Sequence, residues 1–512
     1  MKDRLRRWLQ QNRTSTRLGV VLQAALRIAA SLLALVWTPL LLGAMGTARY
    51  GLFLSFQSVA ALGGLGDFGL GGAISLRTSR HLGAQDHSAL DRFLATARGA
   101  FLLLACIGLV VFLALSPVLP SALGFEPLPG AGSLPLLFAT GSFAIWLLIA
   151  SSYINNLNYA ALNLNWQALP AFVVSQASIL AHIWLAQRNA PLSVQYLTYI
   201  GSSTCSLALG WWVLHKAQPA LARLRPMRLE WPILRQMLAD SAWVYVLGLG
   251  NFVYLTADRL LINGGIGPAF VPVYQLNNKL PELALMLIVS LTYVAMPKLA
   301  LWLGSGRDDD RRRTETEAQR LNLIETLLGL AAAFGYLVIN DAFIRLWLGD
   351  SMSAPLSWQI AFAASLAITI GSNVGIQLST RVNERGLRFV GIVIGLTALL
   401  NFALSFAAMR AGSILGIAAA TVLAQSLMTL TISRYLCGRL GLAWARWAAR
   451  CWLVPVVAVA AVAAVRWHHG WAVTSAAAIG IWLASAWLLG LRPALIRAEW
   501  EVWRGILGRG RK

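Results

Sequence analysis

Two ionisable residues lie in the middle of long apolar segments near the start of the chain. Arg27 falls in VLQAALRIAASLLALVWTPLLLG and Asp67 in FQSVAALGGLGDFGLGGAISL. Each segment is long enough to cross a bilayer, which takes about 20 mostly apolar residues. Arg27 comes ten residues after Arg17, and Asp67 ten residues before Arg77, so each lies roughly 15 Å from the same face at 1.5 Å per residue. Because an unpaired charge at that depth is costly, the pattern indicates a polar path through the membrane.

Arg27 shares one helical face with other polar side chains. Gln23, Ser31 and Thr38 recur at helical spacing around it, which predicts a cavity wall. A guanidinium presents a planar fork of donors that suits a diphosphate. The alternative is a structural ion pair with Asp67 on the next, antiparallel helix, and the sequence leaves both interpretations open.

A second polar stripe follows in the later half of the chain. Gln275, Asn278, Lys279 and Glu282 follow one another at helical spacing, with Pro281 predicted to kink the helix. Lys279 and Glu282 would neutralise each other as a local pair. Two amides on the same stripe exceed what such a pair needs, so the stripe is also predicted to line the cavity.

Four further residues are weaker candidates for the same cavity. Asp258 and Arg259 either line it or cap and snorkel near the membrane edge. Asn373 and Gln377 either line it or hydrogen-bond between helices, which is the commoner use of such residues.

The composition describes a polytopic membrane protein. The chain is 58% hydrophobic and 12% charged, against about 25% charged for a soluble average. Its basic start, MKDRLRRWLQQNR, is followed by a run too long for a secretory signal and at once by another span, so an uncleaved first helix is expected. Fourteen spans are predicted: 18-42, 50-76, 94-119, 134-155, 164-186, 192-214, 238-262, 270-298, 321-346, 356-380, 388-409, 412-433, 450-466 and 471-491.

The distribution of basic residues predicts the orientation. Lys and Arg collect in cytoplasmic loops, and with both termini inside, the predicted outer segments hold only Arg49, Arg188, Arg345, Arg410 and Arg466 of the 42 Lys and Arg residues. The net charge of +22 therefore indicates contact with anionic lipid headgroups rather than nucleic acid.

No motif for a metal site, a cofactor or catalysis is found. The four cysteines have no paired spacing, and His468-His469 is expected to be an exposed polar tip. The longest outer connection, about 118-133, is too small for a catalytic domain, so a transporter rather than an enzyme is expected. No GxxxxGK[ST] sequence occurs, which leaves an ion or voltage gradient, with Asp67 and Glu282 as titrating candidates, or the substrate's own gradient.

Two hinges of similar sequence recur six spans apart. GAMGTARYGLF (43-53) follows span 1, and GGIGPAFVPVYQL (264-276) follows span 7. This repeat predicts an N-terminal lobe of spans 1-6 (1-214), a cytoplasmic linker (215-237), a C-terminal lobe of spans 7-12 (238-434), and spans 13-14 with a basic tail (435-512).

These hinges, with GLGDFGLGGAI, YLTADRLLINGGIG and VYQLNNKLPELAL, resemble the polysaccharide and oligosaccharide-lipid flippases of the multidrug/oligosaccharidyl-lipid/polysaccharide exporter superfamily. Many members have twelve spans, so the last pair is additional. The resemblance implies an all-α, MATE-like membrane fold of two six-helix lobes around a central cavity that opens alternately to either side.

The implied function is the transfer of an undecaprenyl-diphosphate-linked oligosaccharide across a bacterial inner membrane, from the cytoplasmic to the periplasmic face. The product would serve surface polysaccharide synthesis: O-antigen of lipopolysaccharide, exopolysaccharide or capsule. Implied partners are the lipid-linked oligosaccharide, membrane lipids, and a polysaccharide polymerase with other assembly proteins.

Two other functions are weighed against this one. A cation-coupled multidrug exporter of the same superfamily predicts an acidic cavity, whereas the basic Arg27 and Lys279 favour the glycolipid. A membrane-embedded glycosyltransferase, ligase or polymerase predicts a substantial soluble loop, which is not found. The uncharged inner loop SSYINNLNYAALNLNW is either a glycan-contacting mouth or a plain turn with interfacial aromatics, and the small residues of GLGDFGLGG suit close helix packing.

Overall fold

The structure is a computed structural model. It describes residues 16-83, 86-161, 163-223, 227-304, 307-382 and 384-490, and over these ranges the regular elements are all helices. The predicted basic cytoplasmic ends, 1-15 and 491-512, lie outside the described residues.

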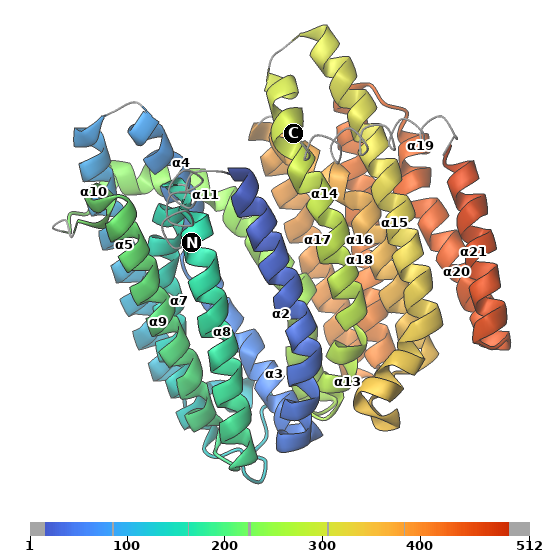
Figure 1. The fold of residues 1–512 in the computed structure, drawn as a ribbon, viewed down its shortest axis with the longest axis horizontal. Coiled ribbons are helices and arrows are strands. Elements are labelled where there is room, and N and C mark those ends of the chain that lie inside the picture. Colours follow the sequence, from blue (N-terminus) through green and yellow to red (C-terminus); the bar gives the residue numbers. More distant parts are fainter. Residues whose placement is uncertain are drawn as a thin grey trace, which may run out of the picture. The chain divides into compact units, whose positions relative to one another are not determined.

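Every predicted span coincides with a helix or an interrupted helix (Figure 1). Spans 1 to 7 correspond to α2 (Thr16–Met45), α3 (Thr47–Ala61) with η1 (Leu62–Leu65) and α4 (Leu70–Gly83), α5 (His87–Leu115), α7 (Leu134–Ala160), α8 (Leu164–Gln187), α9 (Leu192–Ala217), and α11 (Trp231–Phe252) with η2 (Val253–Ala257) and α12 (Asp258–Gly265). Short helices α6 (Leu119–Ala122) and α10 (Pro219–Ala222) lie in connections.

Spans 8 to 14 correspond to α13 (Phe270–Asn277) with α14 (Lys279–Gly304), α15 (Asp308–Leu348), α16 (Leu356–Val382), α17 (Glu384–Arg410), α18 (Ile414–Leu440), α19 (Trp444–Ala448) with η4 (Ala449–Leu453) and α20 (Val454–His468), and α21 (Trp471–Leu488). Among the described residues, ten helices are long and apolar enough to cross a membrane, and the bent pair in span 2 makes an eleventh. The other three predicted spans are α9, α11–α12 and α13–α14, which are more polar or interrupted. The predicted all-α membrane fold is confirmed.

The chain forms two compact units, Met1–Pro272 and Val273–Lys512. The boundary between the two compact units thus lies inside α13. Helix α11 belongs to the first unit, where it packs against α4. The predicted division of the lobes at the linker 215-237 stays a prediction.

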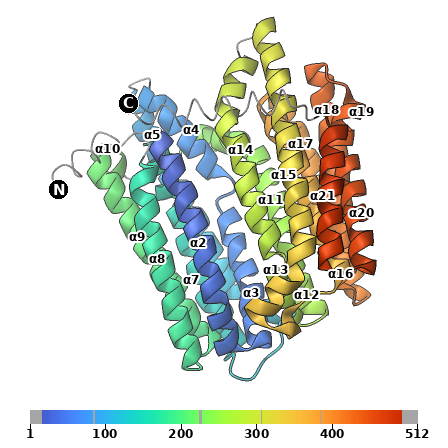
Figure 2. The same cartoon turned by 45° about the vertical axis from the view of Figure 1, so that its right-hand side comes forward.

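In the first unit, α7 packs against α5, α9 and α4, while α8 packs against α2 and α9. Its core includes the fully buried Phe93, Phe101 and Met237. In the second unit, α16 is central and packs against α14, α15, α17, α18 and α20. The additional pair, α20 and α21, packs against α15 on the outside of this unit (Figure 2).

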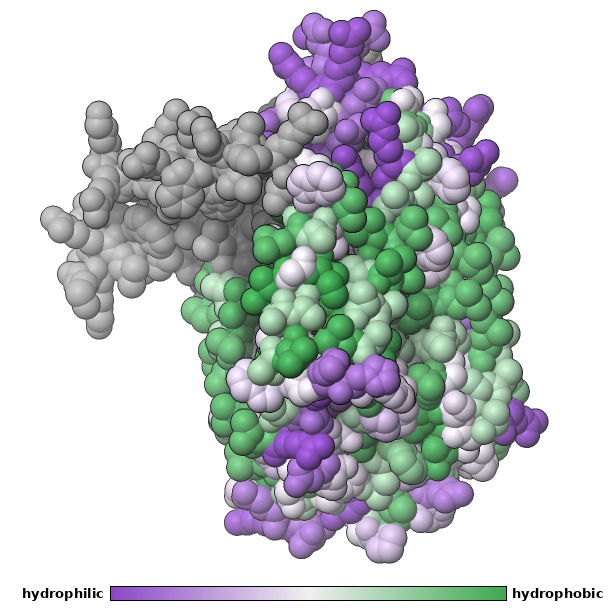
Figure 3. Space-filling model, turned by 90° about the vertical axis from the view of Figure 1, so that its right-hand side faces the viewer, coloured by the Kyte–Doolittle hydropathy of each residue, from purple (hydrophilic) through white to green (hydrophobic). Residues whose placement is uncertain are grey.

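The surface of the second unit has the pattern expected of a membrane protein. On the face shown in Figure 3, hydrophobic side chains form a broad band, and hydrophilic side chains gather at both ends. Such a band fits a lipid-facing surface, since large exposed apolar patches are rare on soluble monomers.

Local sequence explains several helix ends. Between α2 and α3 only Gly46 intervenes, at φ 74°, where a residue without Cβ is favoured. Asp86 caps α5 by accepting hydrogen bonds from the Ala89 amide and the Ser88 hydroxyl, each 3.0 Å long, and these bonds lower the pKa of the Asp86 carboxyl.

Two of the connections predicted on the inner side are largely helical. The charged segment before span 9 is the start of the 41-residue helix α15, with a surface pair between Arg311 and Glu315 at 3.3 Å. The stretch SSYINNLNYA was predicted to open an inner loop, and that prediction is wrong: α7 continues to Ala160. The Asn-rich residues lie on a packed helix, where Asn158 donates to the Gly210 carbonyl at 2.9 Å.

Cysteine labelling tests the predicted orientation. Gly470 and Gly438 both leave open space where a Cβ would lie, so cysteine fits at either position. In a background without the four native cysteines, Gly470→Cys should react with an impermeant thiol reagent added from the periplasm, and Gly438→Cys only after the membrane is permeabilised. Reaction of Gly438→Cys from outside would refute both the orientation and the span count.

Candidate functional site

Span 2 is interrupted in the middle. Helix α3 ends in the 3-10 turn η1, a short turn at 66-69 follows, and α4 resumes with a bend of 42°. Phe68 and Gly69 have φ of 51° and 73°, a conformation that a continuous helix cannot contain. Glycine is favoured at the second of these positions, so the GLGDFGLGG sequence accounts for the break.

Asp67 lies at this break and is 9% exposed. Its Oδ1 accepts a hydrogen bond from the Gly69 amide at 2.9 Å, and its Oδ2 accepts one from the Ser152 hydroxyl of α7 at 2.7 Å. Asn156, one turn further along α7, donates to the Ser152 carbonyl at 2.8 Å. The groups that donate these hydrogen bonds to the Asp67 carboxyl are neutral, and the bond from Ser152 connects span 2 to span 4.

The glycines around Asp67 allow neighbouring helices to approach closely. A Cβ at Gly71 would lie 2.3 Å from Asn156 Nδ2, and one at Gly66 would lie 2.5 Å from Ile149. On another side of the break, the Phe68 ring is 5.1 Å from the Tyr245 ring of α11. The prediction that these small residues serve close helix packing is confirmed.

Span 8 is interrupted as well, between α13 and α14 at Asn278. The predicted kink near Pro281 takes this form because proline cannot donate the backbone hydrogen bond to the carbonyl of residue 277. Proline is tolerated in the first turn of a new helix, where that bond is absent anyway.

Asn277 secures the break in span 8. Fully buried, it donates to the Val273 and Met352 carbonyls, each at 2.8 Å. Its Oδ1 accepts from Asn340 Nδ2 at 3.1 Å and from the Ala354 amide at 3.2 Å. One side chain thus connects α13, α15 and the turn before α16.

The predicted stripe in span 8 lies on both sides of this break. Lys279 Nζ is 3.0 Å from Glu282 Oε2, with side chains 26% and 32% exposed, so the local pair predicted from their spacing is present. Gln275, on α13, is half-buried, and no described residue bonds its buried Oε1. Asn278 is half-buried at the break itself.

Two predicted residues of span 1 fall where the side chains are not described. Arg27 and Gln23 lie within α2, but their side chains are outside the described residues. The ion pair between Arg27 and Asp67 and the substrate-contact role both stay predictions.

The weaker candidates divide into two kinds. Asp258 is buried at the first residue of α12, directly after the π-helical turn η2, and Arg259 is half-buried beside it. Asn373 donates a hydrogen bond to Glu325 on another helix, α15. Gln377 accepts one from Arg381 Nη1 at 2.7 Å within its own helix.

Sequence reasoning missed Glu325, the partner of Asn373. Glu325 is fully buried in α15 and accepts hydrogen bonds from Asn373 Nδ2 at 3.1 Å and from the Thr292 hydroxyl. It belongs to the apolar run NLIETLLGL, and a lone acid within such a run was the signal available. Ser152 and Asn156 were missed because the stretch holding them was assigned to a loop.

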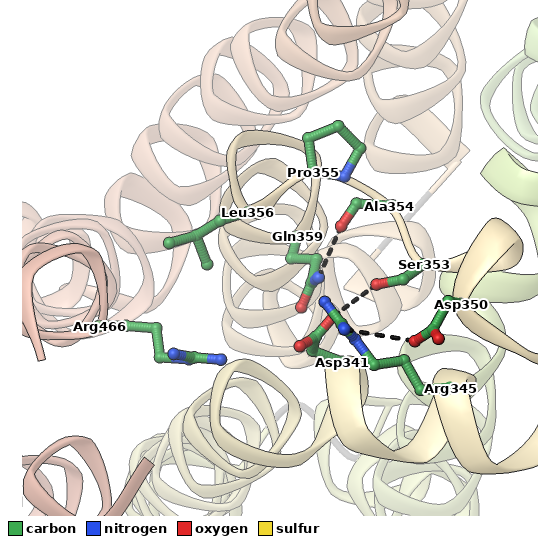
Figure 4. Close-up of a pocket in the computed structure, with 9 residues that line it drawn as sticks. All are labelled: Asp341, Arg345, Asp350, Ser353, Ala354, Pro355, Leu356, Gln359 and Arg466. Atoms are coloured by element: carbon green, nitrogen blue, oxygen red, sulfur yellow. Dashed lines mark hydrogen bonds and ion pairs between the residues drawn. The ribbon is translucent and has the colours of Figure 1, made fainter. Parts of the chain in front are cut away.

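A polar pocket of about 410 Å³ lies at the predicted outer end of the second unit (Figure 4). Arg345 contacts Asp341 at 3.1 Å and Asp350 at 3.3 Å, and Arg466 of α20 points toward Asp341. Its acidic and basic groups are largely paired with one another. These ion pairs therefore connect the end of α15 to the turn before α16.

Comparison with known proteins identifies the fold. No family model matches the sequence, and no curated protein matches it. Among solved structures, the lipid II flippase MurJ in an inward closed conformation gives a TM-score of 0.66 at 12% identity, over 91% of this chain and 98% of that one. The chain shares its fold with this transporter.

Two further structures extend the comparison. An inward-facing multidrug resistance MATE family transporter of the MOP superfamily gives a TM-score of 0.64 at 13% identity, over 82% of this chain and 99% of that one. A MOP superfamily transporter from Pyrococcus furiosus, described by the reversed polarity of its binding pocket, gives 0.55 at 14% identity, over 83% and 94%.

Replacing Asn277 tests whether the break in span 8 depends on it. Asn277→Ala would leave several buried donors and acceptors unpaired, each costing about 1–3 kcal/mol. The variant should unfold at a clearly lower temperature than the wild type in detergent. Asn278→Ala, one residue on and half-buried, is the matched control and should shift the midpoint little. Equal shifts in the two variants would contradict this role of Asn277.

Proposed function

We propose that this protein is a flippase of the bacterial inner membrane that moves an undecaprenyl-diphosphate-linked oligosaccharide from the cytoplasmic to the periplasmic face by alternating access. The translocated glycan would enter O-antigen, exopolysaccharide or capsule synthesis. The supporting observation is that spans 2 and 8 are each broken at an ionisable site.

These two breaks fall at matching places in the predicted repeat. Span 2 is the second span of one half and span 8 the second of the other, and each follows a similar hinge sequence. Interrupted hydrophobic segments at corresponding positions of two halves are the best pointer to the binding site of a transporter. In this proposal Asp67, Lys279 and Glu282 contact the substrate. Asp67 does so in the first unit, and Lys279 and Glu282 do so in the second.

The chemistry of these groups suits a glycolipid with a diphosphate. Lys279 is a partly exposed cation at the start of α14, and Arg27, in α2, is predicted at membrane depth. Both carry the charge that phosphate requires, and Arg adds a bidentate fork. In this proposal Gln23, Gln275 and Asn278 contribute amides, and Asp67 with Ser152 and Asn156 contributes the hydroxyl, amide and carboxyl groups that bind sugar hydroxyls.

The solved structures support this proposal. One neighbour is named as a lipid II flippase, and it covers more of this chain than the multidrug transporter does. The Pyrococcus furiosus protein is described by the reversed polarity of its binding pocket. This supports the idea that proteins of one fold select different substrates by the charge of their pockets. The basic Arg27 and Lys279 favour the glycolipid over the alternative, a cation-coupled multidrug exporter.

The cellular setting is part of the proposal. Both termini are placed in the cytoplasm, where the lipid-linked oligosaccharide is taken up. A polysaccharide polymerase and other assembly proteins would act on the product at the periplasmic face.

Substitution of the two cations tests the proposal in the native host. A charge-assisted hydrogen bond contributes about 1.5–3 kcal/mol, so Lys279→Ala and Arg27→Ala should each lower export of surface glycan about tenfold or more. Lys279→Arg and Arg27→Lys should retain part of it. Surface glycan is measured on intact cells, and protein in the membrane by immunoblot.

Lys298 supplies the matched control. It lies on the same helix as Lys279, exposed over the Trp302 ring at 4.6 Å, so Lys298→Ala should export normally. Normal export by both alanine variants at Lys279 and Arg27, together with drug sensitivity of a deletion strain, would favour the multidrug exporter. Loss of the Arg27→Ala protein from the membrane would favour the structural pair with Asp67.

A further inference from the structure

Glu325 is a buried carboxyl that the proposed substrate contacts do not use. It lies in α15, five residues beyond Arg320, so it is about 7 Å further into the helix at 1.5 Å per residue. Its described partners are Thr292 on α14 and Asn373 on α16. Thr292 is also fully buried, and Asn373 is nearly so. The side chain thus joins three helices of one unit.

None of the charged groups described on the surrounding elements bonds Glu325. On α15, Arg320 pairs with Glu317 at 3.1 Å, and on α14 Lys298 lies over the Trp302 ring. Arg381 of α16 bonds Gln377. The titratable groups of η4 are Arg450 and the buried Cys451. Those of α20 are Arg466 and His468 in its last turn, and the sequence of α21 contains no ionisable residue.

Glu325 therefore lacks a cationic partner among the described residues. A carboxylate charge without a cation in such a place is costly, and the neutral acid is less so. A carboxyl held by neutral donors in a membrane-spanning bundle is suited to bind and release a proton.

Polar side chains follow one face of α16 from this carboxyl toward the predicted cytoplasmic end of the helix. Asn373, Gln377 and Arg381 follow one another every four residues on one helical face. Along this series, exposure rises from the buried Asn373 through the half-buried Gln377 to the exposed Arg381. These side chains are polar groups of α16 that lie between Glu325 and the exposed end of the helix.

We propose that Glu325 is an intramembrane proton-binding site, reached from the cytoplasm along α16, whose occupancy controls the packing of α14 against α15. The step is the binding of one proton to one carboxylate oxygen, with no other bond made or broken. The ionised carboxylate can only accept from the Thr292 hydroxyl, whereas the protonated acid can donate to it, so protonation changes the hydrogen bond that joins α14 to α15. Helix α14 begins at the break of span 8 and carries Lys279, so on the proposed function the proton is coupled to the substrate-contacting residues.

Infrared spectroscopy tests the site without any substrate. In vesicles of phosphatidylethanolamine and phosphatidylglycerol at neutral pH, exposed Asp and Glu are ionised and give no carbonyl band of a protonated acid. The wild type should show such a band, and Glu325→Gln, while remaining folded, should lose the part of it that Glu325 gives, whatever the other buried carboxyls, Asp67 and Asp258, contribute. The control Glu317→Gln, on the same helix at a partly exposed position, should keep it. A band of equal size in Glu325→Gln, or no band in the wild type, would overturn the proposal.

The route and the coupling have separate readouts. Gln377→Leu should slow the deuterium shift of the band severalfold, and an unchanged rate would refute the route along α16. In cells, Glu325→Gln should make the remaining glycan export insensitive to an uncoupler that slows the wild type. An uncoupler effect equal to that in the wild type would refute the coupling. If no glycan is exported by the wild type while the band behaves as expected, the proposed function fails and the proton site stands.

Discussion

A helix that stops inside a bilayer must satisfy the backbone groups that it frees, because no water is present to bond them. At the interruptions of spans 2 and 8, one polar side chain meets part of that constraint. At the break in span 2, Asp67 bonds the Gly69 amide. At the break in span 8, Asn277 bonds two carbonyls and one amide of the backbone. The bends are thereby fixed structural features, and the residues next to them have defined positions.

The same constraint governs where charge is placed. Lys279 and Glu282 are partly exposed and pair with each other. Asp67 and Glu325 are buried and held by hydroxyl, amide and backbone donors. Buried carboxyls of this kind are sensitive to any movement that admits water or a cation. The partly exposed pair is instead available to a phosphate that competes for the Lys279 ammonium.

The sequence predicts the fold well, for a physical reason. Apolar runs of sufficient length and the segregation of Lys and Arg determine the spans, and each predicted span is a helix. It also locates the break in span 8 near Pro281, because proline removes a backbone donor. The interruption at 66-69 depends on positive φ at Phe68 and Gly69, which composition alone does not reveal.

The sequence did not predict several of the side-chain hydrogen bonds between helices. The Asn-rich stretch was assigned to a loop because it is polar, yet Ser152 and Asn156 lie one turn apart on α7 against Asp67. Glu325 was missed because its bonds to Thr292 and Asn373 span distant parts of the sequence. Pairings of this kind follow from packing, and a single sequence does not encode them as a local pattern. The role of Arg27 stays a prediction.

Transport in a purified system tests the central claim, that the protein moves a diphosphate-linked glycolipid. The purified protein would be reconstituted into vesicles containing a polyprenyl-diphosphate-linked oligosaccharide, and transfer between leaflets would be followed by accessibility of the glycan to an added glycosidase. The account predicts faster transfer than in protein-free vesicles, and no acceleration for the same glycan on a lipid without phosphate. Transfer at the protein-free rate, with extrusion of a cationic dye from the same vesicles, would contradict it.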